Sequence, residues 1–120
     1  MVLSTSINKV IVYVVDDELA VAEDVSSFLH CNGIAAQVCL NWESFHATFD
    51  GCAAGVVILD LNMPEIDGLE FQERLRREGI EVPIIFLSGR GDISSAVSGL
   101  KQGAVDFLEK PINPEVLLKA

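Results

Sequence analysis

Acidic, hydroxyl and basic side chains stand at the ends of the apolar segments of this sequence. Asp16 and Asp17 follow one apolar run, and Asp60 follows another. Ser88 and Lys110 follow two more. A carboxylate nucleophile, a divalent metal ion, a lysine and a hydroxyl are what phosphoryl transfer requires, because its catalysis consists mainly of positioning and charge neutralisation. These residue types therefore predict phosphoryl chemistry, provided that the fold brings them together.

Carboxylates gathered at one place also predict a bound cation. Asp16, Asp17 and Asp60 would repel one another and raise their own pKa values unless a cation neutralised them. Oxygen ligands without histidine or cysteine nearby favour a hard metal ion, and an open, partly hydrated site suits Mg²⁺, with Mn²⁺ as the substitute. Lys110 would add a fixed positive charge on the opposite side.

Each of these residues also has a plainer structural interpretation. An Asp-Asp-Glu run after a strand is often only a helix N-terminus, where acids cap free N–H groups and interact with the helix dipole. Asp60 could form the turn before Pro64. Ser88 and Gly89 could likewise be a turn, and Lys110 a surface charge. The functional interpretation is favoured because an unpaired charge ending a buried strand is costly, and because all the groups follow strands.

Five short apolar runs supply the strands that would position these groups. They are rich in Val and Ile, and their lengths suit strands better than helices. The first, third and fourth are nearly continuous in apolar character, as expected for parallel strands covered on both faces. The second is more mixed and is expected nearer an edge. The runs cover residues 10–15, 34–40, 56–59, 82–87 and 105–108.

Helical patterns separate the strands. Residues 18–31 carry one apolar face, and Asn32 and Gly33 provide a stop signal. A last helix is expected from Asn113, where Pro114 suits the first turn. Strict alternation of strands and helices predicts an α/β fold with a doubly wound parallel sheet, whose ligands bind beyond the carboxyl ends of the strands. The other predicted helices cover residues 42–49, 69–77 and 93–102.

Composition narrows the classes of function. The 120 residues, half of them apolar, fit one domain with its own core. A formal charge of −10 argues against direct binding to nucleic acid or an anionic membrane. Cys31, Cys39 and Cys52 have neither the even count nor the spacing of a disulfide framework or zinc site. The sequence shows no secretory signal and no apolar run near the roughly 18 residues of a membrane span, so a cytoplasmic location is expected.

The chain ends about two turns into its last predicted helix. A covered sheet normally needs the complete helix, so residues 1–120 are expected to be one domain cut from a longer protein, with that helix truncated.

The sequence resembles, over essentially its whole length, the receiver family of two-component response regulators. The matching stretches are VDDE at 15–18, DLNMPEIDG at 60–68, PIIFLSGRGD at 83–92 and GAVDFLEKP at 103–111. The resemblance implies a flavodoxin-like (βα)5 fold with a five-stranded parallel sheet of order 2-1-3-4-5. It implies that Asp60 is the phosphoacceptor and that Asp16, Asp17, Asp60 and the backbone carbonyl of Asn62 bind Mg²⁺.

The same resemblance implies roles for the remaining site residues. Ser88 and Lys110 would contact the phosphoryl oxygens, and Phe107 would be an aromatic switch that moves inward as Ser88 moves toward the phosphoryl group. Asn62 and Arg90 would tune the lifetime of the phosphoryl group. The plainer alternative for Phe107 is an ordinary core aromatic.

Taken together, the family pattern implies a signalling switch rather than an enzyme, although the domain would assist its own phosphorylation and dephosphorylation. A sensor histidine kinase would be the donor. The surface of the fourth helix, fifth strand and fifth helix would carry the response and a phosphorylation-dependent homodimer. Residues 89–92, 96–97 and 106–111 are most similar to FixJ-like regulators. That similarity implies a helix-turn-helix output domain beyond residue 120, through which the protein would bind DNA and regulate transcription.

Other functions remain as alternatives. A degenerate or stand-alone receiver would act as a protein-interaction module without phosphorylation. A flavodoxin-like cofactor binder would need a phosphate loop after the first strand, where Asp16, Asp17 and Glu18 would instead repel phosphate. A phosphatase of the haloacid-dehalogenase type would carry its nucleophile after the first strand, whereas Asp60 follows the third.

Overall fold

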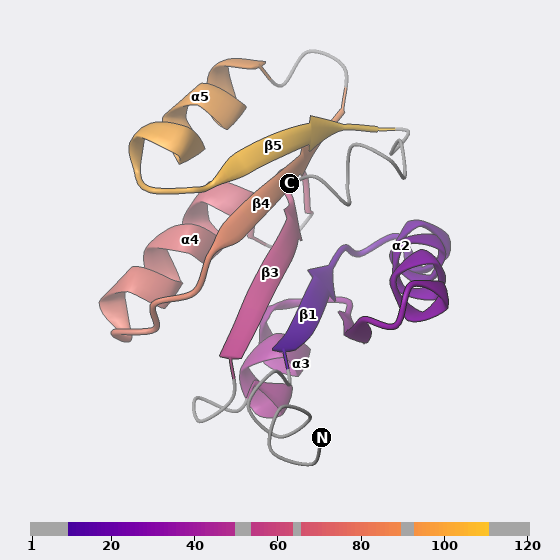
Figure 1. Cartoon of the computed structure of the whole chain (residues 1–120). Helices are drawn as coiled ribbons and strands as arrows, with labels where there is room; N and C mark the ends of the chain where they lie inside the picture. The colour runs from indigo at the N-terminus through magenta and orange to yellow at the C-terminus, as the bar shows by residue number, and fades with distance from the viewer. Residues whose placement is uncertain (1–9, 50–53, 64–65, 90–92, 111–120) are drawn as a thin grey trace.

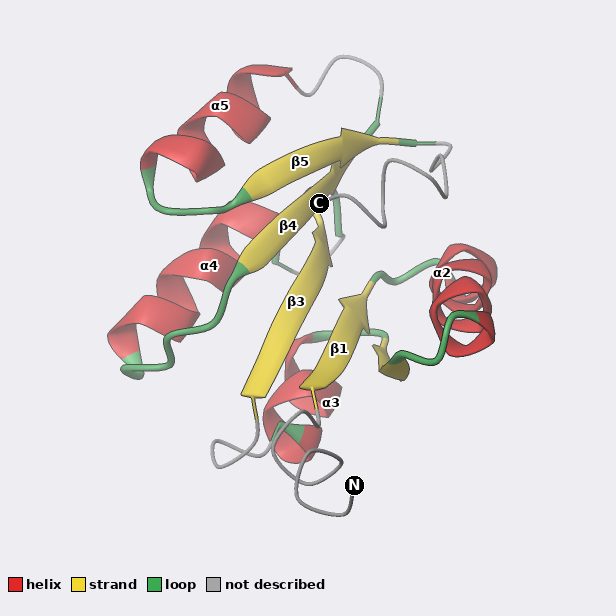
Figure 2. Cartoon of the chain, in the orientation of Figure 1, coloured by secondary structure: helices red, strands yellow, loops and turns green. Residues whose placement is uncertain are grey.

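The computed structural model describes residues 10–49, 54–63, 66–89 and 93–110, in which strands and helices alternate (Figures 1 and 2). The helix predicted from Asn113 and the residue Arg90 lie outside these ranges. In chain order the elements are β1 (Val10–Val15), α2 (Leu19–Cys31), β2 (Ala35–Cys39), α3 (Trp42–Thr48), β3 (Ala54–Asp60), α4 (Gly68–Arg77), β4 (Ile84–Ser88), α5 (Ile93–Lys101) and β5 (Asp106–Glu109).

All five strands form one parallel sheet in the order β2-β1-β3-β4-β5, which confirms the predicted topology. The mixed second strand lies at an edge, as its sequence indicated. The chain reverses its direction of travel across the sheet between β1 and β3. The carboxyl ends of these two strands are therefore the switch point at which ligands bind in open α/β sheets.

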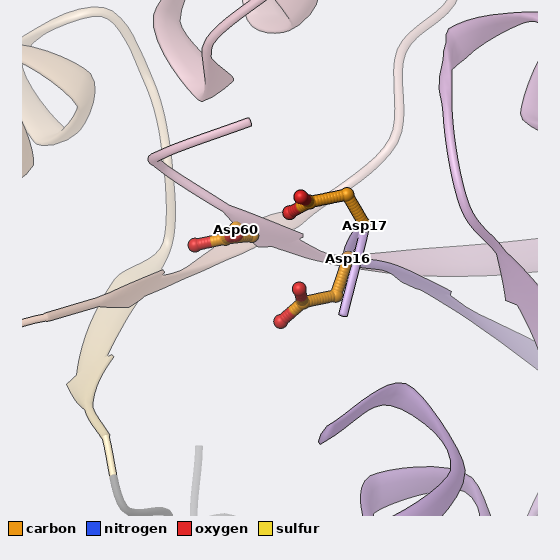
Figure 3. Close-up of side chains that lie close together, drawn as sticks. All are labelled: Asp16, Asp17 and Asp60. Carbon is orange, nitrogen blue, oxygen red and sulfur yellow. The ribbon is translucent and has the colours of Figure 1, made fainter. Parts of the chain in front are cut away.

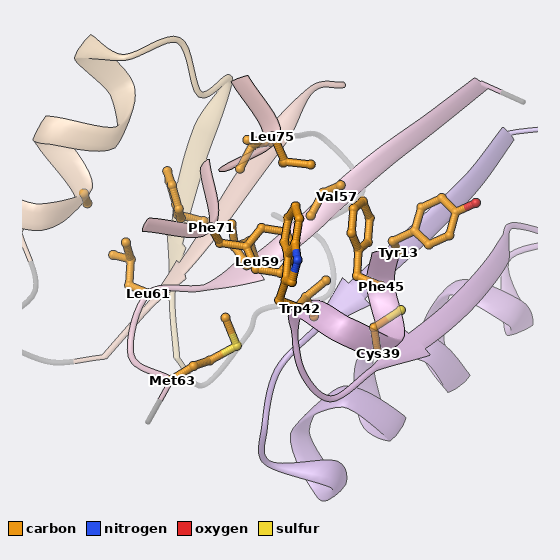
Figure 4. Close-up of a cluster of buried hydrophobic side chains, with 14 residues drawn as sticks. Tyr13, Cys39, Trp42, Phe45, Val57, Leu59, Leu61, Met63, Phe71 and Leu75 are labelled. Carbon is orange, nitrogen blue, oxygen red and sulfur yellow. The ribbon is translucent and has the colours of Figure 1, made fainter. Parts of the chain in front are cut away.

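Helices cover both faces of the sheet. Figure 1 shows α2 on one side and α3, α4 and α5 on the other. Side chains alternate between the faces along each strand, so the core has two parts. The buried residues under α2 are aliphatic, and the partly buried Phe28 packs against them. The part under α3, α4 and α5 carries the buried aromatic residues, many of them drawn in Figure 4: Tyr13, Trp42, Phe45, Phe71 and Phe86.

Short polar contacts fix where two of the helices begin. The Ser44 amide donates to Asn41 Oδ1 at 2.8 Å, and the Asn41 amide donates to Ser44 Oγ at 3.3 Å. The Glu70 amide donates to Asp67 Oδ1 at 2.9 Å. These contacts satisfy N–H groups that have no partner within their own helix, and they fix the helix starts that follow β2 and β3.

The strand boundaries differ in detail from the predicted ones. The strand β4 begins at Ile84, two residues later than predicted, because Pro83 has no N–H to donate to a neighbouring strand. The Pro83 carbonyl still accepts from the Val57 amide at 2.9 Å. Asp60 and Ser88 are the last residues of β3 and β4 rather than residues that follow them. Their backbones are therefore held in the sheet.

Candidate functional site

Three aspartates meet at the carboxyl ends of the two central strands (Figure 3). Asp16 and Asp17 follow β1, and Asp60 ends β3. One carboxylate oxygen from each lies within 4.8 Å of the others. Asp16 and Asp60 are 0% and 2% exposed, whereas Asp17 is exposed to solvent. The gathering of carboxylates that the sequence predicts is therefore present, with two buried carboxylates and one that faces water.

The Lys110 side chain reaches into this cluster from the far edge of the sheet. Its Nζ lies 3.1 Å from Asp16 Oδ2, 3.3 Å from Asp60 Oδ1 and 3.5 Å from Glu18 Oε1. The Lys110 amide donates to the Ser88 carbonyl at 2.8 Å. This hydrogen bond extends the pairing of β5 with β4 and holds the backbone of Lys110 in place. Its contact with Glu18 was not predicted, although the Asp-Asp-Glu run already placed that residue beside the site.

The environment of Asp60 raises the pKa of its carboxyl to about 6. Burial is the largest cause, and the nearby charge of Asp16 adds to it. The Asn62 amide, which donates to Asp60 Oδ1 at 3.2 Å, and the Lys110 ammonium both act in the opposite direction. The Asn62 amide and the Lys110 ammonium therefore do not fully compensate the negative charge of ionised Asp60.

The pKa of Lys110 is raised above its usual value. Burial alone would lower it, but the contacts with Asp16 and Asp60 outweigh that effect. Lys110 is therefore a permanent cation at the site.

The donor set fits a hard divalent cation. Asp16 Oδ2 is buried and has no hydrogen-bond partner among the described residues, and its contact with Lys110 is an ion pair. In an octahedral Mg²⁺ site with metal–oxygen distances of about 2.1 Å, neighbouring ligand oxygens lie about 3 Å apart and opposite ones about 4.2 Å. The three carboxylate oxygens lie within 4.8 Å of one another, close enough to be offered to a single cation, and the exposed Asp17 leaves the site open to water.

Replacing Asp60 with Asn is expected to stabilise the metal-free domain. The folded-state pKa of Asp60 lies above its ordinary value of 3.8, so its ionised form destabilises the fold. An amide keeps an acceptor for the Asn62 N–H without the charge. We expect the free energy of unfolding at neutral pH in EDTA to rise by roughly 1 to 3 kcal/mol. Urea unfolding measures it, with the exposed Asp24→Asn on α2 as the control.

The difference in the free energy of unfolding between Asp60→Asn and the parent should depend on pH in a defined direction. In the parent, folded Asp60 takes up a proton as the pH falls through about 6, while the unfolded chain does so only near 3.8. The advantage of Asp60→Asn should therefore be complete above pH about 6 and disappear as the pH falls toward about 4. An advantage that grows on acidification would contradict this account of the site.

The side chains of Ser88 and Phe107 lie on the face of the sheet that α2 does not cover. Ser88 is buried at the end of β4, two residues after Phe86, and both side chains point toward the same face. Phe107 pairs with Phe86 across β4 and β5 and packs, half-buried, against the aromatic core. The two predicted switch residues therefore share the face covered by α4 and α5.

The loop after β3 runs close to the start of α4. Asn62 is exposed, and its amide is the donor to Asp60 described above. The Gly68 amide donates to the Leu61 carbonyl at 2.9 Å, and a Cβ built on Gly68 would lie only 2.8 Å from the Asp60 carbonyl oxygen. Only glycine allows α4 to begin this close to the end of β3.

A groove of about 360 Å³ opens beside Asp17. Trp42, the only tryptophan of the chain, lies in its wall with Met63. Figure 4 shows Trp42 among the aromatic side chains of the core, next to Phe45 and Phe71, with Met63 toward the edge of the cluster. The Arg74 guanidinium carbon lies 5.6 Å from the centre of the Trp42 ring. Trp42 and Asp17 therefore line the same groove, so the Trp42 side chain can serve as a fluorescence reporter for the site.

No helix in the described part of the chain has the length and apolar character needed to cross a membrane.

Comparisons of the sequence and the structure with known proteins all indicate the same protein family. The sequence model of the response regulator receiver domain matches residues 12–120. The response regulator protein TodT of Pseudomonas putida F1 is 42% identical over 110 residues, which cover 92% of this chain and 48% of TodT. The transcriptional regulatory protein FixJ of Rhizobium meliloti is 38% identical over 109 residues, which cover 91% of this chain and 53% of FixJ. The chain therefore spans about half the length of these relatives.

Solved structures show the same fold. The crystal structure of FixJ-N superposes with a TM-score of 0.82 at 37% identity, covering 91% of this chain and 87% of that one.

Proposed function

The chain belongs to the response-regulator receiver family of two-component systems, and we propose that it accepts a phosphoryl group on Asp60 in a reaction that depends on Mg²⁺. The observation that carries this proposal is the position of Asp60. It is buried at the end of the central strand β3, 3.3 Å from the Lys110 ammonium and within 4.8 Å of the ligand oxygens of Asp16 and Asp17.

The proposed reaction transfers a phosphoryl group from a phosphohistidine of a sensor histidine kinase. An oxygen of the Asp60 carboxylate forms a bond to phosphorus as the bond from phosphorus to the imidazole nitrogen breaks. The nitrogen keeps the electron pair, and the product is an acyl phosphate on Asp60. Because the pKa of Asp60 is about 6, most of this carboxyl is ionised at neutral pH and can act as the nucleophile.

Mg²⁺ would neutralise the charge that gathers on the transferred group. Asp16, Asp17, Asp60 and the backbone carbonyl of Asn62 are the proposed ligands, and Mn²⁺ has the same ligand preference. Lys110 already lies among these carboxylates, so its ammonium can move to an oxygen of the phosphoryl group without leaving the site. Arg90 and the Asn62 side chain are proposed to set the lifetime of the acyl phosphate.

The proposed switch uses the face that Ser88 and Phe107 share. The Ser88 hydroxyl would turn toward a phosphoryl oxygen, and Phe107, half-buried beside Phe86, would move inward. This movement would change the surface formed by α5, β5 and the helix predicted from Asn113. We propose that this surface forms a homodimer or contacts the output domain.

The output is proposed to be transcriptional. FixJ is named a transcriptional regulatory protein, and about half of its length lies outside the match to this chain. A helix-turn-helix domain after residue 120 would supply the DNA contacts that a domain of charge −10 does not favour. A cytoplasmic location is part of the same proposal, because DNA and the kinase's phosphodonor domain would both have to reach the protein.

Lys110→Met is expected to separate phosphorylation from the switch. Without the ammonium, the phosphoryl group loses its contact with β5, so Phe107 should no longer respond. We expect acetyl phosphate to change the amide NMR shifts of Phe107 and Leu108 in the parent and to leave them nearly unchanged in the phosphorylated variant. Lys101→Met, the same change at an exposed lysine of α5, is the control. Parent-like shift changes in Lys110→Met would show that the contact is unimportant.

The proposed function is tested by the intact mass of the domain after incubation with acetyl phosphate. With Mg²⁺ we expect a gain of one phosphoryl group, and with EDTA we expect almost none. The degenerate-receiver alternative predicts no gain in either sample. An equal gain in both samples would contradict the metal dependence.

A further inference from the structure

A buried amide joins α4 to α5. Gln72, on α4, is 4% exposed, and its Nε2 donates to the backbone carbonyl of Gly99 on α5 at 3.1 Å. Its Oε1 is buried and has no partner within the described ranges of the chain. A buried amide is costly unless it is hydrogen-bonded, so this contact with α5 offsets part of the cost of burying Gln72.

The Gly99 carbonyl is the group that closes the C-terminal end of α5. It accepts from the Gln102 amide at 3.2 Å and from the Ala104 amide at 3.1 Å. Gly103 follows the helix with a φ of 111°, a conformation that suits glycine and ends the helix in a Schellman turn. Gln72 is therefore bonded to the end of α5 that leads into β5.

The same glycine packs directly on Phe86 of β4. A Cβ built on Gly99 would lie 2.3 Å from Phe86 Cε2, and a Cβ built on Gly68 would lie 3.0 Å from Phe86 Cε1. The Phe86 ring is fully buried and is thus held between α4 and α5. At Gly99 there is no space for α5 to move toward the sheet, and Gln72 resists its movement away from α4.

Within the described residues, the beginning of α5 has neither the hydrogen bond from Gln72 nor the close packing on Phe86 that hold the Gly99 end. It begins at Ile93, a few residues after Ser88. Figure 1 shows α5 beside β5, with its later part next to α4. Phe107 lies beside Phe86 and is half-buried. An inward movement of Phe107 therefore needs space under α5, and the end fixed at Gly99 cannot provide it.

We propose that Gln72 is a tether that makes the C-terminal end of α5 a fixed pivot, so that switching moves the beginning of the helix while the Gly99 end keeps its place. This role rests on the proposed function for its switching part. In the resting domain it needs only the contacts of Gln72 with Gly99, and there it can be tested independently.

The test is residue-resolved amide hydrogen exchange of the domain and its Gln72→Leu variant. Leu keeps the volume near that of Gln and removes the hydrogen bond. Gln37→Leu, the same change at an exposed position of β2, is the matched control. The exchange rates of the Ala104 and Val97 amides are each divided by that of Val57 in the central strand. If Gln72→Leu does not fold, Gln72→Met replaces it.

In the resting state we expect the relative exchange rate of Ala104 to rise about fivefold in Gln72→Leu and to stay unchanged in Gln37→Leu. After phosphorylation with acetyl phosphate and Mg²⁺, the relative exchange rate of the parent should rise at Val97 and stay unchanged at Ala104. In Gln72→Leu, phosphorylation should change the relative exchange rates of both amides. An Ala104 rate in resting Gln72→Leu equal to that of the parent would overturn the tether. Equal changes at the two amides in the phosphorylated parent would overturn the pivot.

Intact mass measured on the same samples separates the two proposals. If no phosphoryl group is gained, the proposed function fails, and the resting comparison of Gln72→Leu with Gln37→Leu still decides whether the tether exists.

Discussion

The Asp60→Asn variant is expected to gain no phosphoryl group from acetyl phosphate and Mg²⁺, while the parent gains one. An amide is a far weaker nucleophile than a carboxylate, and Asp60 is the carboxylate that Lys110 and the Asn62 amide contact at the end of β3. Since the same substitution is predicted to stabilise the metal-free fold, we do not expect unfolding to cause the loss of labelling, and urea unfolding of the variant checks this. Intact mass recorded over time measures the effect.

The control for this prediction is Asp24→Asn, which removes one acidic charge from an exposed position on α2. It should be labelled like the parent. Labelling of Asp60→Asn at a comparable rate would place the acceptor on another residue and would leave the burial and pKa of Asp60 without a functional explanation.

Asp17→Ala is expected to lower the affinity for Mg²⁺ at least tenfold, since losing even an outer contact of a metal site costs about 10- to 100-fold. Asp17 is exposed, so its replacement should leave the fold intact. The remaining carboxylates, Asp16 and Asp60, would still attract a cation but would offer it one ligand fewer. Trp42 lies in the groove that Asp17 lines, so its fluorescence can follow the titration, with calorimetry as a second readout.

Glu18→Ala is the matched control for the metal prediction. Glu18 carries the same charge one residue further on, but its carboxylate contacts Lys110 and is not one of the clustered oxygens. Its loss should weaken Mg²⁺ binding only through the change in overall charge, by a few-fold. Equal effects of the two substitutions would show that Asp17 acts through its charge and is not a ligand.

Much of the sheet could be predicted because the first, third and fourth strands are nearly continuous apolar runs. Their order was implied by the family resemblance, and the gathering of polar residues at one rim follows from the geometry of parallel strands. The exact limits of β4 depend on Pro83, whose missing N–H delays the strand by two residues. Helix starts at Asn41 and Asp67 rest on side-chain caps that became evident only with the structure.

The meeting of three aspartates and Lys110 at one end of the sheet could be predicted from the sequence, but the pKa values at the site could not. Mutual repulsion among aspartates was expected to raise their pKa values, and the pKa of Asp60 is raised. Burial is the larger cause, and a sequence does not give the extent of burial. The sequence also could not give the distances of Lys110 from Asp16 and Asp60, because the three residues lie at the ends of different strands, far apart along the chain.

Gln72 shows why some positioning residues escape sequence reasoning. A glutamine in a polar helix such as α4 is expected on the surface, since its neighbours Glu73 and Arg74 are charged. Its burial follows from the close approach of α5, which the glycine at position 99 permits. Neither residue signals the contact alone, and they lie 27 positions apart.

The most direct measurement is chemical mapping of the phosphorylated residue. The domain is phosphorylated with acetyl phosphate and Mg²⁺, treated with borohydride, which reduces an acyl phosphate of aspartate to homoserine, and then digested and sequenced by mass spectrometry. We expect homoserine at position 60 and at no other aspartate. Homoserine at position 16 or 17, or phosphate retained on a histidine with every aspartate unreduced, would contradict it.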